Sequence, residues 1–261
     1  MNLFNKTNVL QLPFLGVLIV LGLLLSVWSP RTFNADPATS QRMDHHQFVE
    51  FIAKQADIAN IQITQNRQQL LNLYRQFNHH RPLSAISLLW LQELAKDYKI
   101  ANPQFKHDST WQTLIERVDI IPESLVVAQA IEESGWGTSR FAQAANNYFG
   151  QQCYRDGCGL SPQDNDNASF QLRKFPDALS SVRSYMSNLN SLSAYEDFRE
   201  QRYDLRTDDK PLTGLALIDT ITSYSERGND YIDTIRTIIS QYDLTRYDAI
   251  GLFQNQYFTY L

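Results

Sequence analysis

A long stretch without glycine or proline, residues 46–77, most constrains the fold of this chain. Within it Phe48, Ile52 and Ala56 recur at the spacing of one helix face, with Phe51 beside them, which predicts an amphipathic helix. Pro82 interrupts the pattern, and Ser84 stands where a cap would begin a second, leucine-rich helix. We therefore expect a linker and helical arm over residues 33–105.

The remainder alternates helical segments with one polar stretch. Between residues 146 and 175, glycine, aspartate and amide side chains dominate, and only residues 169–175 alternate as a short strand or hairpin would. The fold class is therefore mainly α, with a small β-hairpin lobe and a cleft between lobe and helical body. The predicted helices cover residues 84–98, 122–134, 139–145, 176–190, 212–225 and 230–242. The apolar positions of the first are Leu88, Leu89, Leu91, Leu94 and Tyr98. Gly135 should end the second helix, and Thr138 or Ser139 should cap the third.

The segment Val9–Trp28 is apolar and carries no charged residue. Its length just suffices to cross a bilayer, which needs about 20 apolar residues. We expect residues 1–32 to be a single-pass anchor in the inner membrane, with the catalytic part in the periplasm. A cleaved secretory signal and a buried soluble helix are the alternatives.

The charge pattern and the cysteines limit which partners and cofactors this protein is expected to bind. A net charge of −5 with both signs spread along the chain argues against a nucleic-acid partner. Cys153 and Cys158 flank an Asp-Gly turn and could form a disulfide across a hairpin; two free thiols or a metal site are the alternatives. Two thiols alone lack the remaining zinc ligands, and no histidine spacing suggests a metal. We expect no metal, nucleotide or redox cofactor.

Two adjacent carboxylates, Glu132 and Glu133, end the helix over residues 122–134. They point about 100° apart around its axis. A carboxylate is disfavoured at a helix C-terminus, and burial beside Trp136 would raise its pKa further. Glycoside hydrolysis requires such a protonated acid to donate to the leaving oxygen. On its own, a glutamate at a helix end is more often a solvated surface residue.

A resemblance to a known family favours the catalytic interpretation. The run AQAIEESGWG at Ala128–Gly137, then TSRFA, then NNYFG at Asn146–Gly150, resembles the signature of the glucosaminidase domain family. That family includes flagellar peptidoglycan hydrolases of the FlgJ type and staphylococcal-type autolysins. Residues 58–71, 153–160 and 180–185 resemble the bacterial Bax protein family within it. The resemblance spans about residues 46–245.

This resemblance implies a lysozyme-like fold over residues 106–245, followed by a tail over 246–261. It implies that Glu133, directly before Ser-Gly-Trp-Gly, is the catalytic acid. The implied reaction is endo-β-N-acetylglucosaminidase hydrolysis of the β-1,4 bond on the reducing side of N-acetylglucosamine in peptidoglycan. Glu132 occupies a position that is usually apolar in the family.

The family's second acid lies in the small lobe, where the candidates are Asp156, Asp164 and Asp166. Residues 167–171, which correspond to the strand that often bears this acid, contain no carboxylate. Either a shifted aspartate serves, or the acetamido group of the substrate acts as nucleophile.

Several further residues are candidates for substrate binding. Tyr224 and Tyr231 resemble the late tyrosine motif of the family. Tyr224 either contacts the substrate or packs between helices, and Tyr231 shares an apolar stripe that favours packing. Asn147 and Phe149 are expected to shape the cleft floor, or to form a structural turn beside Gly150. Trp136 is either a sugar platform or a core residue.

Two other functions remain open. A non-catalytic peptidoglycan-binding scaffold would fit the missing lobe carboxylate, and a muramidase or lytic transglycosylase would cut the alternate bond. A protease is not expected, because no Ser-His-Asp or Cys-His pattern stands out.

Overall fold

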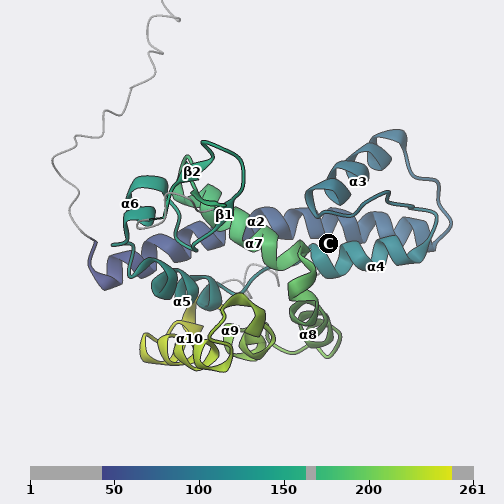
Figure 1. Cartoon of the computed structure of the whole chain (residues 1–261). Helices are drawn as coiled ribbons and strands as arrows, with labels where there is room; N and C mark the ends of the chain where they lie inside the picture. The colour runs from purple at the N-terminus through teal and green to yellow at the C-terminus, as the bar shows by residue number, and fades with distance from the viewer. Residues whose placement is uncertain (1–42, 163–168, 249–261) are drawn as a thin grey trace, which may run out of the picture. The chain divides into compact units, whose positions relative to one another are not determined.

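The computed structural model describes residues 43–162 and 169–248 (Figure 1). No helix within these ranges is both long and apolar enough to cross a membrane. The predicted anchor Val9–Trp28, the candidate acids Asp164 and Asp166, and tail residues 249–261 lie outside the described residues.

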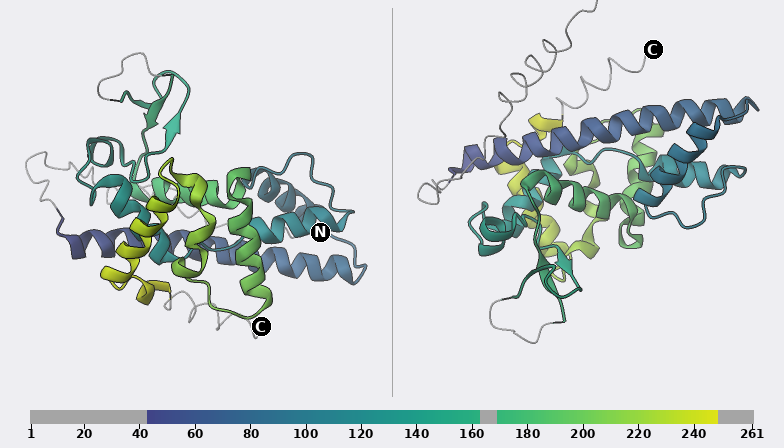
Figure 2. Two further views of the ribbon diagram at one scale, coloured as in Figure 1. Left: turned by 60° about the horizontal axis from the view of Figure 1, so that its bottom comes forward. Right: turned by 90° about the horizontal axis from the view of Figure 1, so that it is seen from above.

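A single long helix, α2 (His45–Asn78), runs along the helical body (Figure 2). Asp44 caps it by accepting a hydrogen bond from the backbone N–H of Gln47, whose side chain bonds back to Asp44. The helix predicted over 46–77 is confirmed. Phe48 and Ile52 are fully buried, so the apolar stripe faces the core as expected.

The centre of the main core is α5 (Glu123–Ser134), which packs against α2, α9 (Gly214–Leu217) and α10 (Asn229–Gln241). All residues from Ser124 to Ala130 are fully buried. A helix that is apolar around most of its circumference needs partners on every side. Gly135 ends it in the left-handed conformation (φ 55°), as its position in the sequence predicts.

The second half of α2 belongs to a separate core with α3 (Ala85–Asp97) and α4 (Asp108–Arg117). Ser84 caps α3 as predicted, with its hydroxyl 3.1 Å from the N–H of Ser87. The expected apolar face of α3 is wrong in part, because Leu89 is 63% exposed while Leu91 is buried. The sequence did not reveal α4, which contributes Trp111 to this core.

Two further helical regions differ from expectation. The helix α8 (Glu196–Thr207) was not predicted, because two of its inward-facing positions are the buried arginines Arg199 and Arg202. The helix predicted over 212–225 is instead α9 followed by the 3₁₀ turns η2 (Ile218–Thr220) and η3 (Thr222–Tyr224). The break occurs because Ile221 leaves the helical conformation, with φ −109° and ψ 27°.

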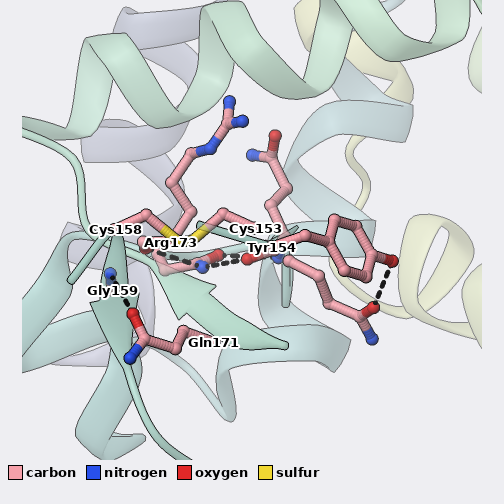
Figure 3. Close-up of a disulfide and its surroundings, with 9 residues drawn as sticks. Cys153, Tyr154, Cys158, Gly159, Gln171 and Arg173 are labelled. Carbon is pink, nitrogen blue, oxygen red and sulfur yellow. Dashed lines mark hydrogen bonds between the residues drawn. A yellow bond between two sulfur atoms is a disulfide. The ribbon is translucent and has the colours of Figure 1, made fainter. Parts of the chain in front are cut away.

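The polar stretch forms a small lobe with a three-stranded sheet. It contains β1 (Gln152–Cys153), β2 (Gly159–Leu160) and β3 (Gln171–Arg173), in the order β1-β3-β2 with antiparallel pairing. The lobe is therefore not a simple hairpin, since β3 returns between the two earlier strands. A disulfide between Cys153 and Cys158, with a Cα–Cα distance of 6.2 Å, links the end of β1 to the start of β2 (Figure 3).

Short capped helices flank the lobe on both sides. The helix α6 (Arg140–Ala145) precedes it, and Ser139 caps that helix by accepting from the N–H of Ala142 at 3.1 Å. The helix α7 (Ala178–Ser191) follows the lobe, capped by Asp177. The lobe thus joins the body through two helices, α6 directly after α5 and α7 packed against α2.

Candidate active site

Glu133 occupies the last turn of α5, and its carboxyl group lies between α10 and the start of the lobe. Its Oε1 accepts a hydrogen bond from the Tyr231 hydroxyl at 2.9 Å. Its Oε2 lies 3.7 Å from the place where a Cβ on Gly150 would be. Gly150 has a φ of 64°, a conformation that favours glycine, and it brings the backbone leading into β1 close to the carboxyl.

Tyr231 belongs to a chain of neutral buried groups that begins one helical turn before Glu133. The amide of Gln129 donates to the Tyr231 hydroxyl at 2.9 Å and accepts from the Tyr185 hydroxyl. Because Tyr231 accepts from Gln129, its own hydrogen is directed at Glu133. Gln129 and Tyr185 were not singled out from the sequence, although a buried polar residue four positions before Glu133 is a usable signal.

Two stacked aromatic pairs link these hydrogen-bonded side chains to the lobe. The Phe149 ring stacks on Tyr185 with centroids 4.2 Å apart, and Tyr224 stacks on Tyr231 at 5.5 Å. The Tyr224 hydroxyl donates to the backbone oxygen of Phe149 at 3.2 Å. The structure thus brings the candidates Phe149, Tyr224 and Tyr231 together beside Glu133.

Asn147 forms hydrogen bonds with the backbone at the base of the lobe. Its side chain is buried and its amide donates to the carbonyl oxygens of Gln151 at 2.8 Å and Arg173 at 3.0 Å. Its Oδ1 accepts from the N–H of Gln151 at 3.0 Å. Both amide hydrogens are therefore used within the protein, and the residue holds the start of β1 to the end of β3.

Trp136 packs between the ends of two helices. Its ring stacks on His45 at the start of α2, with centroids 3.7 Å apart and planes 7° apart. Its edge contacts include Tyr242, just after α10, at 4.8 Å, and Phe48 at 6.1 Å. Trp136 thus holds α2 and α10 against the turn that follows Glu133.

The candidate second acids lie in the lobe. Asp156 is exposed in the turn between Cys153 and Cys158. It is the one carboxylate among the described lobe residues, 150–162 and 169–175.

The surroundings of Glu133 favour its protonated form. Burial raises the pKa of its carboxyl, the Tyr231 hydrogen bond lowers it, and the neighbouring Glu132 raises it again. Arg227 lowers this pKa, but burial prevails and the net shift is upward. The C-terminal end of α5 acts in the same direction. The site can therefore offer a proton to a bound substrate at a pH where an exposed glutamate is ionised.

Comparisons with known proteins identify the relatives of this chain. Residues 108–244 match the Glucosaminidase family model, described as mannosyl-glycoprotein endo-beta-N-acetylglucosaminidase. "Protein bax" of Escherichia coli (strain K12) is 40% identical over 141 residues, which cover 54% of this chain and 50% of that protein. "Exo-glucosaminidase LytG" of Bacillus subtilis (strain 168) is 29% identical over 146 residues, with the same coverage.

The match to the two curated relatives spans about half of their length. No solved structure is significantly similar to the chain. The family model covers more than half of the chain and includes Glu133 together with the late tyrosines. The chain therefore belongs to the glucosaminidase family.

Proposed function

We propose that this chain is a peptidoglycan hydrolase of the β-N-acetylglucosaminidase type and that Glu133 is its general acid. The observation that carries this proposal is the environment of the Glu133 carboxyl. Burial raises its pKa, one oxygen is held by Tyr231, and the other faces Gly150 at the start of the lobe. Family membership and the named activity of the Bacillus relative support the same chemistry.

In the proposed reaction, Glu133 donates its proton to the oxygen of the β-1,4 bond on the reducing side of N-acetylglucosamine. The bond between C1 and that oxygen breaks, and positive charge develops on the sugar ring. Water then adds its oxygen to C1, and the proton that it loses passes to the assisting aspartate or, where the substrate acetamido group participates, to the carboxylate of Glu133. Tyr231 stabilises the carboxylate that Glu133 becomes, because its hydroxyl already donates to Oε1.

The group that assists the water is either a lobe aspartate or the substrate itself. Asp156 is exposed in a turn, and Asp164 and Asp166 lie outside the described residues. Participation of the substrate acetamido group requires no second carboxylate in the protein. The single carboxylate of the described lobe residues is compatible with that route.

We also propose that the catalytic part works outside the cytoplasm. The Cys153–Cys158 disulfide supports this location, because such bonds persist in oxidising compartments. The segment Val9–Trp28 would tether the chain to the inner membrane, where the periplasmic peptidoglycan is within reach.

The test is digestion of purified peptidoglycan by the full chain, followed by mass spectrometry of the new reducing ends. Wild type should release fragments that end in N-acetylglucosamine. Glu133→Gln keeps the shape and the acceptor for Tyr231 but removes the acid, so we expect a loss of about 10²–10⁴-fold in rate. The matched control is Glu93→Gln, which changes an exposed glutamate of α3 and should leave the rate unchanged.

Three outcomes would contradict the proposal. Products ending in N-acetylmuramic acid or an anhydro sugar would indicate a muramidase or lytic transglycosylase. Full activity of Glu133→Gln would remove Glu133 from the mechanism. A folded wild type that binds peptidoglycan without cutting it between about pH 4 and pH 8 would indicate a scaffold protein.

A further inference from the structure

We propose that Glu132 and Arg227 form a charge-compensated positioning pair, which holds the segment before α10 against the end of α5 and shields Glu133 from the charge of its neighbour. This inference rests on the proposed function, since it assigns a role in tuning the acid of that same site. It concerns the carboxylate that directly precedes Glu133 on α5.

The contacts of Arg227 link α5 to α10. Its Nη1 lies 2.6 Å from Oε1 of Glu132, and its Nη2 donates to Oγ1 of Thr234 at 2.7 Å. The guanidinium carbon is 5.9 Å from the centroid of the Tyr231 ring. One side chain thus contacts the helix that carries Glu133 and flanks the tyrosine that bonds to it.

The two adjacent glutamates use different sides of α5, because neighbouring positions are about 100° apart on a helix. Glu133 points to the Tyr231 hydroxyl, while Glu132 points to Arg227. The pair is partly exposed, at 26% for the Glu132 side chain and 50% for Arg227. Solvent therefore screens it, and its direct contribution to stability is expected to be small.

The charges that face Glu133 are few. Apart from Glu132 and Arg227, the titratable groups near it in the described part of the chain are neutral tyrosines from α7, η1, η3 and α10: Tyr185, Tyr195, Tyr224 and Tyr231. Arg227 also lines an open hollow of about 460 Å³ together with Asp230 and Asp233. The full charges closest to the acid are therefore one carboxylate and one guanidinium that neutralise each other.

Removing either partner should therefore shift the titration of Glu133, and in opposite directions. Without Arg227, the bare carboxylate of Glu132 would make Glu133 hold its proton to higher pH. Without Glu132, the bare guanidinium would make Glu133 lose its proton at lower pH. For a partly exposed pair we expect shifts of about 0.5–1 pH unit.

The experiment measures kcat/KM against pH for wild type, Glu132→Gln, Arg227→Gln and the double variant. In parallel, ¹³C NMR titrates the Glu133 carboxyl, whose resonance is assigned by its absence in Glu133→Gln. The alkaline limb of the profile and the NMR midpoint should move down for Glu132→Gln and up for Arg227→Gln. The double variant should lie within about 0.3 pH unit of wild type, and Arg227→Lys should restore the wild-type midpoint.

The control is Arg236→Gln on α10, whose ion pair with Asp219 has the same 2.6 Å distance but involves no residue of the site. It should shift neither midpoint. Shifts of the same sign in both single variants, or loss of activity without any shift, would contradict the proposal that the pair shields Glu133 electrostatically. If wild type itself cuts no peptidoglycan, the proposed function fails, and the NMR titration still decides the inference.

Discussion

Two carboxyl groups in different regions of this protein, the buried Asp119 and the partly buried Glu133, have opposite electrostatic surroundings. Asp119, between α4 and α5, accepts hydrogen bonds from Arg206 at 2.8 and 3.1 Å and forms an ion pair with Arg67 at 3.5 Å. The buried Arg202 donates to the backbone oxygen of Asp119 at 3.2 Å. Glu133, at the end of α5, accepts instead from the neutral hydroxyl of Tyr231.

The comparison shows that the neighbouring charges and hydrogen bonds, and not burial alone, decide whether the carboxyl is ionised. Burial raises the pKa of both carboxyls. Around Asp119 three guanidinium groups outweigh burial, so its pKa falls well below the usual range. Around Glu133, the Tyr231 hydroxyl and the compensated Glu132–Arg227 ion pair do not outweigh burial, so the pKa of Glu133 rises. The first group stays ionised and joins α2, α4 and α8, whereas the surroundings of the second favour its protonated form.

The largest effect is expected from Asp119→Ala, which would leave three arginines without their counter-charge. We expect the free energy of unfolding to fall by about 3–5 kcal/mol at neutral pH, measured by urea denaturation. Because the folded pKa of Asp119 is lowered, its stabilisation is present above its ordinary pKa of 3.8 and is lost as pH falls through the folded value. The difference between wild type and variant should therefore shrink in acid. Equal stability of the two at pH 7 would contradict the comparison, and Asp156→Ala is the exposed control.

An intermediate effect is expected at another buried carboxyl, Glu123, which accepts a side-chain hydrogen bond from Asn60 at 2.8 Å. Burial raises the pKa of Glu123 to about 7, even though the hydrogen bond from Asn60 lowers it. The folded state then binds the extra proton, so the contribution of Glu123 to stability is highest below pH 4.5 and falls as pH rises through about 7. Glu123→Gln should be more stable than wild type by about 1–3 kcal/mol above that pH.

The measurement is urea denaturation of wild type and Glu123→Gln in acid and at alkaline pH. The gain should vanish near pH 4, because the wild-type carboxyl is then protonated in both states. A gain that is the same at both pH values would show that packing, and not ionisation, causes it. Glu93→Gln on the surface of α3 is the control for the loss of one exposed carboxylate.

The smallest effect on stability is expected from Glu133→Gln, although we propose that this change has a large effect on hydrolysis. Its raised pKa means that the wild-type site loses stability as pH rises above 4.5, so the variant should gain slightly at neutral pH. The gain should stay under about 1 kcal/mol, because the carboxyl is partly exposed and solvent screens its charge. Thermal unfolding at pH 4 and pH 8 checks this, and a clear loss of stability would show that Glu133 is structural like Asp119.

Local chemistry in the sequence determined much of the helical framework. The extent of α2 follows from its apolar periodicity and its lack of glycine and proline. Ser84 and Ser139 cap the starts of α3 and α6, and Gly135 ends α5, as their residue types predict. These features depend on residues within one or two turns, so they can be seen without the fold. The motif around Glu133 likewise indicated the family, because its residues are contiguous.

Only the tertiary structure decided which groups surround the acid. Tyr231 is 98 residues from Glu133 along the chain, and Arg227 is 95 residues from Glu132. The buried arginines of α8, the place of β3 between the other strands and the role of Gln129 depend equally on distant segments. A buried polar group takes its partner from whichever segment packs against it, and periodicity along one helix contains no information about that choice.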